Sequence, residues 1–413
     1  MISAKELAVL RELGAKKREI GELEIQKRNF NLWRDVNSLR RSRPAVKFDE
    51  LPWSELEAAE PEDLKPVCSD PFLREIETGL RQELYQWNHF PVDMIVEPIV
   101  YCNLVAGPSS SYADYGIKEN PERLEGAHDV VYRTVIDSLE QADMIQTPKV
   151  WHDKVETERR FALLLEIFAG VIPVKKRGIV HQWHAAWDQI IHWYRIEQLY
   201  TDMYERPELV HRIVANFTKA QIAVLDEQER LGLLDTGNGA WRVGSGGYGV
   251  IDGLPERVEG RNVVPGDQWG CANAQIFSEV SPEMHYEFSL QYDLQLLQRY
   301  RVNYYGCCEP LHRKFEMLRK IPNLRKISAS PKAKIDEFAA QAGREFVVSW
   351  KPNPAILATN SFDEVYARKY LRDAIDKCAG CNMEIILKDV STIRGDPKRL
   401  AQLGKIAMEA VCG

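Results

Sequence analysis

Short apolar runs alternate with longer amphipathic segments from about residue 93 to the C-terminus. The short runs are rich in β-branched and aromatic residues, a composition typical of strands. Strands are predicted over Asp93–Tyr101, Val171–Lys176, Arg301–Cys308, Leu324–Ala329, Glu345–Trp350 and Met383–Asp389. The longer segments repeat apolar positions at helical spacing. They predict helices over Glu156–Ala169, Glu197–Tyr204, Glu208–Leu231, Pro282–Tyr300, Lys332–Gln341, Phe362–Lys377 and Pro397–Val411.

This alternation of strands and helices predicts an α/β fold. Strands joined through helices run parallel and are connected by right-handed crossovers. The alternating stretch is long enough for a (β/α)8 TIM barrel with insertions. A doubly wound open sheet is the alternative interpretation.

The first 90 residues have a different pattern. Ser3 and Glu6 have the spacing of a capping box, and Leu7, Leu10 and Leu13 follow at helical spacing. A proline-rich stretch then indicates a linker or a wrapping segment. We therefore predict a helical N-terminal extension and linker over residues 1–90 and a barrel over residues 91–413. A second capping box is predicted from Ser361 to Glu364.

Composition and charge narrow the class of protein. Apolar residues make up 45% of the 413-residue chain and charged residues 28%, which is ordinary for a globular protein. A net charge of −7 argues against nucleic acid as a partner. No apolar run is long enough to span a membrane, and the charged N-terminus does not resemble a signal peptide. Eight cysteines are too few for a disulfide scaffold, so we expect a reducing, cytoplasmic location.

A glycine-rich segment, Gly244–Gly249, satisfies the spacing G-x-G-x-x-G. A dinucleotide site needs a strand before this motif and a helix that begins within it. The residues that follow have turn chemistry and no helical period. We therefore predict a mobile loop over a pocket rather than a nucleotide site.

Candidate chemistry gathers where the predicted strands end, which is where barrel enzymes carry their sites. Charged or nucleophilic side chains stand there, and aromatic and imidazole side chains follow nearby. They are Glu97, Cys308, Glu309, Lys351, Lys388 and Asp389, with His181, Trp183, His184 and Trp241 in the segments between strands. Each has a structural alternative. Glu97 can form an ion pair with Lys351 or Lys388, a cysteine on the strand can be an inert core thiol, and the tryptophans can be core.

Several segments, in order along the chain, resemble the uroporphyrinogen decarboxylase superfamily. They are HQWHAAWDQIIHWYRIEQLYTDMYERPELVHRIVANF, CANAQIFSEVSPEMHYEFSLQYD, VNYYGCCEPL, SWKPNPAIL and EIILKDVSTIRGDPKRL. Together they cover roughly residues 91–411. The resemblance implies a TIM barrel with a deep pocket at the strand ends.

That superfamily contains porphyrinogen decarboxylases and zinc-dependent methyltransferases that work with a cobalamin on a partner protein. Glu97 stands where the decarboxylases carry a catalytic Asp, and no Arg-rich loop precedes it. Tyr305 or Gly306 stands where the methyltransferases carry a zinc-binding His. The later Cys position falls near Asp389. Cys308 is the one zinc-ligand position that the resemblance retains.

The leading hypothesis from these features is a methyltransferase. It would move a methyl group from a small methylated substrate, a methyl ether or methylamine, to a corrinoid protein. Cys308, Glu309 and Asp389 are predicted to hold zinc, and Glu97, Glu309 and Lys351 to be catalytic. Substrate contacts are predicted for His181, Trp183, His184, Trp241, Tyr305 and Lys388. The sequence leaves open whether the protein forms a homodimer. The alternatives are a decarboxylase or lyase, with Glu97 as acid and Lys351 as carboxylate partner, and a catalytically inactive barrel.

Overall fold

The computed structural model describes residues 2–108, 113–123 and 130–413 and has an α/β architecture. Its main sheet has six parallel strands in the order β1-β12-β11-β10-β9-β8. The strands are β1 (Ala45–Phe48), β8 (Trp269–Ala272), β9 (Val302–Tyr305), β10 (Leu324–Ala329), β11 (Val347–Trp350) and β12 (Asn382–Leu387).

A second parallel pair extends this arrangement. It consists of β2 (Val100–Asn103) and β7 (Val174–Arg177). Two isolated parallel bridges, Ile179–Leu234 and His184–Ala272, link the segment after β7 to a neighbouring segment and to β8. Among the described residues no hydrogen bonds pair β1 with β2. The strands are therefore barrel-like, with an interruption between β1 and β2, and a closed eight-stranded barrel is not established.

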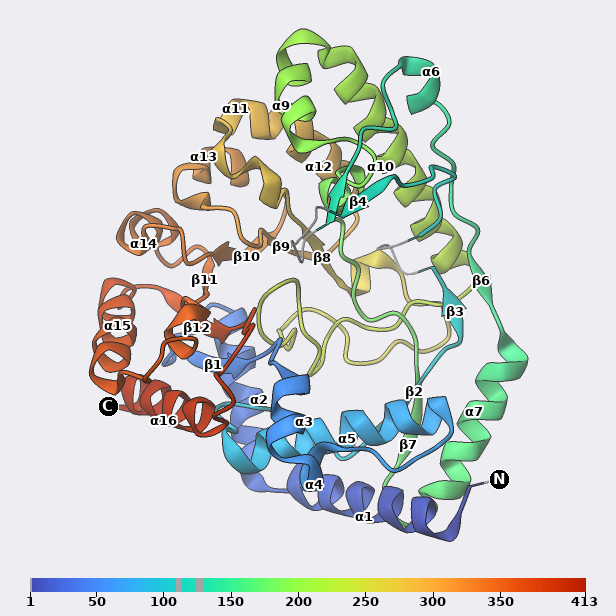
Figure 1. Ribbon diagram of the computed structural model, residues 1–413, viewed down its shortest axis with the longest axis vertical. Coiled ribbons are helices and arrows are strands. Elements are labelled where there is room, and N and C mark those ends of the chain that lie inside the picture. Colours follow the sequence, from blue (N-terminus) through green and yellow to red (C-terminus); the bar gives the residue numbers. More distant parts are fainter. Residues whose placement is uncertain (1, 109–112, 124–129) are drawn as a thin grey trace.

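Helices surround the strands on the outside (Figure 1). They are α1 (Ala4–Gly21), α2 (Glu24–Asn37), α3 (Trp53–Ala59), α4 (Pro61–Leu64), α5 (Pro71–His89), α6 (Leu139–Ala142), α7 (Lys154–Ile167), α8 (Ala186–Ile190), α9 (Ile196–Glu205), α10 (Pro207–Arg230), α11 (Pro282–His285), α12 (Gln291–Leu297), α13 (Phe315–Leu318), α14 (Ile335–Ala342), α15 (Glu364–Lys377) and α16 (Lys398–Cys412). Two short antiparallel pairs also occur, β3 (Ala106–Gly107) with β6 (Trp151–His152) and β4 (Pro121–Arg123) with β5 (Val130–Tyr132).

The largest apolar core lies between the main sheet and the helices that follow it in sequence. Strands β9 to β12 contribute buried residues to this core, as do α13 to α16. All six residues of β12 are buried, which is the pattern of a parallel strand covered on both faces. The core thus packs strands β9 to β12 against helices α13 to α16.

Most predicted elements are confirmed within a few residues, and β10 matches its predicted bounds. The strand predicted over Asp93–Tyr101 is wrong for its first seven residues, because only β2 from Val100 onward is a strand. The backbone of these seven residues instead accepts hydrogen bonds from side chains of α2. Asn29 donates to the Met94 carbonyl, and Trp33 donates to the Asp93 carbonyl. Of the predicted capping boxes, that at Ser3 is confirmed, whereas Asp363 caps α15 in place of Ser361.

Residues 1–90 are largely helical, as the sequence predicted, but they also supply β1. This strand pairs with β12 in parallel register, from Ala45 opposite Glu384 to Phe48 opposite Leu387. A four-residue strand between prolines has too short an apolar run to be recognised by periodicity. The sheet therefore takes one of its strands from the segment that was expected to lie outside it.

The glycine-rich segment is not a loop on the surface, which corrects the expectation of a mobile cover. Residues 243–250 are all buried inside the ring of strands (Figure 1). A Cβ on Gly247 would lie 2.1 Å from the Trp33 ring, and one on Gly244 would lie 2.4 Å from the Tyr304 ring. Glycine is required here because the backbone itself packs against large side chains.

Candidate functional site

A cavity of about 510 Å³ lies where β1 and β2 are not paired. The last residues of β1, β2 and β7 line it, together with α5, Lys17 of α1 and part of the glycine-rich segment. The carboxyl ends of parallel strands are the usual place for ligands in α/β proteins. This cavity is therefore the candidate functional site.

Arg177, the last residue of β7, forms one wall of the cavity. Its guanidinium lies 4.8 Å from the centre of the Tyr101 ring and 5.2 Å from that of Trp241. Its Nε donates to Asn103 Oδ1 at 2.8 Å. Burial lowers the pKa of Arg177 from its usual value, without making it neutral near pH 7.

Arg242 connects the cavity to charged groups at the ends of β1 and β12. Its guanidinium pairs with Glu50 at 2.5 Å and lies 3.9 Å from Asp49. Glu50 in turn pairs with Lys388 at 3.4 Å, and Lys388 with Asp389 at 2.9 Å. The predicted residues Lys388 and Asp389 thus belong to a chain of ion pairs that ends at the cavity.

Two adjacent thiols stand beside this chain. The Sγ atoms of Cys307 and Cys308 are 3.6 Å apart, and Lys388 Nζ is 3.8 Å from Cys307 Sγ. A hydrogen bond from Cys307 and the nearby charge of Lys388 lower the pKa of Cys308 to about 7. Cys308 is exposed, so it combines thiolate character with access to reagents.

A polar network fills the interior of the strand arrangement. Lys351 Nζ donates to the Tyr304 hydroxyl and Ser349 Oγ, both at 2.8 Å, and to the Ser349 carbonyl at 2.9 Å. The Tyr304 hydroxyl also lies 2.7 Å from Ser245 Oγ of the glycine-rich segment. Burial lowers the pKa of Lys351 to about 7. Lys351 uses its three donor positions within this network, which differs from the predicted role as a substrate partner.

Below this network lies a fully buried ion pair between β10 and β12. Lys326 Nζ contacts Glu384 Oε2 at 2.7 Å, and Glu384 Oε1 accepts from the Gly247 amide and from Ser349 Oγ. Burial alone would raise the pKa of Glu384, but Lys326 and the hydrogen bonds outweigh it and lower the pKa. The glycine-rich segment is thereby attached to the charged interior.

The predicted imidazoles, half-buried His181 and buried His184, make separate contacts. The Gly244 amide donates to His181 Nε2 at 2.9 Å, so this nitrogen carries no proton, and burial lowers the pKa of His181 to about 4. His184 Nε2 lies 2.8 Å from the Tyr300 hydroxyl, and burial lowers its pKa to about 3. Trp183 packs against an apolar cluster that includes Trp269. None of these three side chains lines the cavity.

Glu97 and Trp241 lie near the cavity wall. Glu97 precedes β2 rather than ending a strand, which corrects its predicted position, and it accepts a 3.3 Å hydrogen bond from the Tyr101 hydroxyl. Burial raises the pKa of Glu97. The Trp241 ring packs on Tyr101 and Arg177. Lys351 contacts Tyr304 and Ser349 instead, so Glu97 and Lys351 belong to different contact networks.

Tyr305 lies on the helix-facing side of β9, which corrects its prediction as a substrate contact. Its hydroxyl lies 2.8 Å from His285 Nε2 of α11. Successive side chains of a strand point to opposite faces, so Tyr304 faces the interior and Tyr305 cannot. Neither tyrosine lines the cavity.

The predicted zinc ligands Cys308, Glu309 and Asp389 do not form a ligand set in the described residues. Glu309 is buried, and its two carboxylate oxygens accept from the Ala274 and Cys307 amides at 3.2 and 2.8 Å. Asp389 pairs with Lys388. A carboxylate that already neutralises backbone donors or a lysine is not free to hold a metal, so no zinc-dependent step is supported here.

One group in the described part of the chain has metal-ligand spacing. Glu60, Asp63 and His89 place ligand atoms within 4.8 Å of one another. Glu60 already accepts from the Tyr85 hydroxyl, and His89 stacks on the Tyr85 ring at 4.2 Å. Glu60 lies between α3 and α4, Asp63 is in α4 and His89 ends α5, and none of them lines the cavity.

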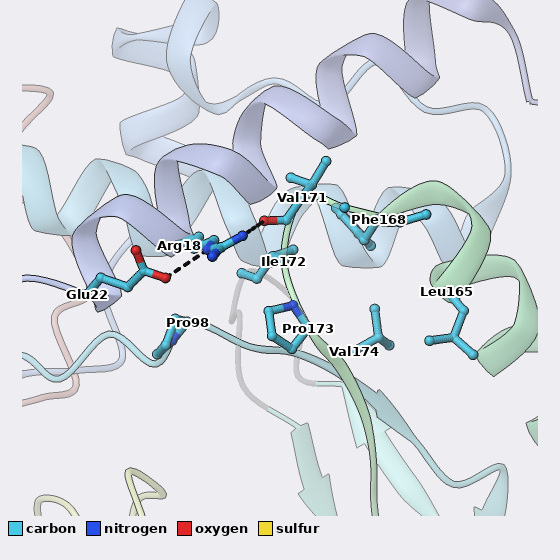
Figure 2. A pocket seen from close by; sticks show the side chains of 11 residues that line it. Arg18, Glu22, Pro98, Leu165, Phe168, Val171, Ile172, Pro173 and Val174 are labelled. Carbon is cyan, nitrogen blue, oxygen red and sulfur yellow. Dashed lines mark hydrogen bonds and ion pairs between the residues drawn. The ribbon is translucent and has the colours of Figure 1, made fainter.

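A second cavity, of about 400 Å³, lies at the amino end of β7, the end of the strand opposite to Arg177. Figure 2 shows that its wall is mostly apolar, with Arg18 and Glu22 at one side. Arg18 pairs with Glu22 at 2.8 Å and donates to the Val171 carbonyl at 3.1 Å. These groups satisfy one another, and the cavity offers no group for catalysis.

Sequence reasoning missed several residues of the site. They are Lys47, Asp49, Tyr101, Arg177 and Arg242, which line the cavity, and Glu50, which pairs with Arg242. Arg177 stands directly after a predicted strand, so the search for charged side chains at strand ends could have found it. Asp49 and Glu50 follow β1, which was not recognised as a strand, so no signal marked them.

Comparisons with known proteins support the fold. In the described residues no helix has the length and hydrophobicity needed to span a bilayer. No family model matches the chain, and no curated protein matches it. Among solved structures, the chain is similar to a methyltransferase from Methanosarcina mazei with a TM-score of 0.51 and 8% identity. The match covers 92% of this chain and 98% of that chain, so the two share an overall fold.

Proposed function

We propose that the protein is a methyltransferase that moves a methyl group from a small methylated substrate to a corrinoid carried by a separate protein. The observation that carries the proposal is the cavity between β1 and β2, at the strand ends of a fold shared along nearly its whole length with a methyltransferase. A methyl ether or a methylamine is the substrate class.

The chain's part in this reaction is to bind the substrate and to stabilise the leaving group. The corrinoid, when bound, supplies the nucleophile that takes the methyl carbon. The leaving oxygen or nitrogen then gains an electron pair and needs a proton or a nearby positive charge. Lys47 and Arg242 line the cavity beside their partners Asp49 and Glu50, and the leaving atom would compete with these carboxylates for their positive charge. Lys47 can also donate a proton, so that the alcohol or amine leaves in neutral form.

The decarboxylase alternative is less well supported. It needs Glu97 and Lys351 to act on one substrate, whereas Lys351 donates to Tyr304 and Ser349 under the glycine-rich segment. The zinc-dependent form of methyl transfer loses its predicted ligands. The proposal therefore relies on the cations of the cavity.

The test is a spectroscopic methyl-transfer assay. Purified protein is mixed with reduced cobalamin and a panel of methyl ethers and methylamines, and the loss of the Co(I) absorption band is followed. We expect turnover of at least one substrate, and a loss of rate of about 100-fold in Lys47→Met, within the range of a removed proton donor. Lys369→Met, an exposed lysine of α15, is the matched control.

Two results would contradict the proposal. One is the absence of Co(I) consumption with every substrate of the panel. The other is turnover without corrinoid, such as release of carbon dioxide from a polycarboxylate, which would favour the decarboxylase instead.

A further inference from the structure

Arg177 differs from every other cation at the wall of the cavity. Lys17 pairs with Glu83 at 2.6 Å, Arg242 pairs with Glu50 at 2.5 Å, and Lys47 pairs with Asp49. Arg177 pairs with no carboxylate among the described residues, and its one hydrogen bond there uses Nε on Asn103. Both of its Nη groups therefore have no acceptor in the described part of the chain.

Two adjacent aromatic rings hold the position of this guanidinium. The rings of Tyr101 and Trp241 lie 4.8 and 5.2 Å from it, and these rings contact each other at 5.1 Å. Stacking of this kind fixes the plane of the guanidinium without using its N–H donors. A guanidinium with a fixed plane and two free Nη groups matches the geometry of a carboxylate, which accepts two parallel hydrogen bonds.

The remaining wall indicates the rest of the ligand. Apolar side chains from α3, α5 and the segment before β2 line the cavity, among them Trp53, Ile76, Leu80, Met94 and Ile95. Four cationic and three anionic side chains share the wall: Lys17, Lys47, Arg177 and Arg242 against Asp49, Glu75 and Glu83. Lys17, Lys47 and Arg242 already pair with carboxylates, so the positive charge left for a ligand is that of Arg177, which favours one negative charge over a dianion.

We propose that the cavity binds a small monocarboxylate with an apolar body, whose carboxylate pairs with the Nη groups of Arg177. The body of the ligand then packs against the apolar wall formed by α5 and the residues before β2. This assignment deepens the proposed methyl transfer by adding a carboxylate to the methyl ether or methylamine substrate, and it rests on that function only for the later fate of the ligand.

The test measures binding alone, with no corrinoid present. Benzoate is the probe, with benzamide as its neutral counterpart of similar shape and phenyl phosphate as the dianion. Ligand-observed NMR titrations at pH 7 give the dissociation constants for wild type, Arg177→Gln, Arg177→Lys and the control Arg257→Gln. Arg257 is exposed and pairs with Glu259 at 3.0 Å, so its loss leaves the cavity unchanged.

We expect wild type and Arg257→Gln to bind benzoate equally, and benzamide and phenyl phosphate more weakly. Arg177→Gln should weaken benzoate binding by about 10- to 100-fold, the value of a lost charge-assisted pair, and leave benzamide binding unchanged. The affinity of Arg177→Lys for benzoate should lie between those of wild type and Arg177→Gln, since a lysine keeps the charge but not the bidentate geometry.

Three results would overturn the assignment: equal benzoate binding by wild type and Arg177→Gln, equal binding of benzoate and benzamide by wild type, or tighter binding of phenyl phosphate. The comparison of probes on wild type keeps the test valid if a variant folds poorly. Benzoate binding through Arg177 without methyl transfer to cobalamin would refute the proposed function only. Methyl transfer from uncharged substrates without benzoate binding would refute this assignment only.

Discussion

Lys351 Nζ lies 2.8 Å from the hydroxyl oxygen of Tyr304, and this hydrogen bond joins β11 to β9 across the intervening strand β10. The contact places a lysine in the buried interior with no bulk water around it. Water normally stabilises the charged form of lysine, so its removal favours the neutral form. The charge of this buried lysine therefore responds to pH near neutrality.

The first prediction concerns the pH dependence of stability. Lys351 has a pKa of about 7 in the folded state, against 10.5 as the ordinary value. Between these pH values the unfolded chain binds a proton that the folded chain does not, so this residue makes stability rise with pH. Lys351→Met should reduce the slope of the free energy of unfolding by about 1.4 kcal/mol per pH unit between pH 8 and 10.

Urea unfolding at a series of pH values measures this slope. Lys369→Met, on the exposed face of α15, is the control and should keep the wild-type slope. Identical slopes for wild type and Lys351→Met would show that Lys351 remains protonated in the folded protein.

The second prediction concerns the buried ion pair. Lys326→Met leaves the Glu384 carboxylate without its partner in a dry interior and should cost about 3–5 kcal/mol of unfolding free energy. The double variant Lys326→Met/Glu384→Gln removes both charges and should cost clearly less than the two single variants added together. Chemical unfolding of the four proteins completes the cycle, and strict additivity of the two losses would argue against a direct pair.

The third prediction concerns the glycine-rich segment. In Gly247→Ala the new Cβ would lie 2.1 Å from Trp33 Cζ3 and 3.0 Å from Glu384 Oε2, so backbone or ring must move. We expect a loss of about 1–3 kcal/mol, as for other overpacked sites. Gly266→Ala is the control, since its Cβ would meet no atom closer than 3.8 Å. Equal thermal unfolding temperatures for both variants would mean that the segment does not pack inside the ring of strands.

The fourth prediction concerns the reactivity of Cys308. Its pKa of about 7 places half of the thiol in the reactive form at neutral pH. The rate of alkylation by iodoacetamide should have a phase that is half-maximal near pH 7. That phase should be lost in Cys308→Ser and kept in Cys381→Ala, and it should move to higher pH in Lys388→Met. A wild-type profile that persists in Cys308→Ser would assign the reactivity to another cysteine.

The periodicity of the chain was enough to predict most strands of the main sheet and most of the helices that pack against it. Continuous apolar runs such as Leu324–Ala329 predict buried strands because both faces must avoid water, and this requirement is local. Two strands of the six-stranded sheet escaped this reasoning: β1 lies in a short run between prolines, and β8 contains glycine and cysteine beside its tryptophan and alanine. Without β1, the acidic residues after it could not be placed at the site.

By itself, the sequence determined the α/β class, the parallel direction of the strands and the enrichment of charged groups where strands end. The class and the strand direction follow from the alternation of strand-like and helix-like apolar patterns, and the charged groups are read directly from the residue types. The tertiary structure alone decided that Tyr304 rather than Tyr305 faces the interior, that Glu309 is used by backbone amides, and that Arg177 forms no ion pair with a carboxylate among the described residues. Such facts depend on strand register and on which distant segments meet. A one-residue shift moves a side chain to the opposite face of a sheet, and local pattern does not record it.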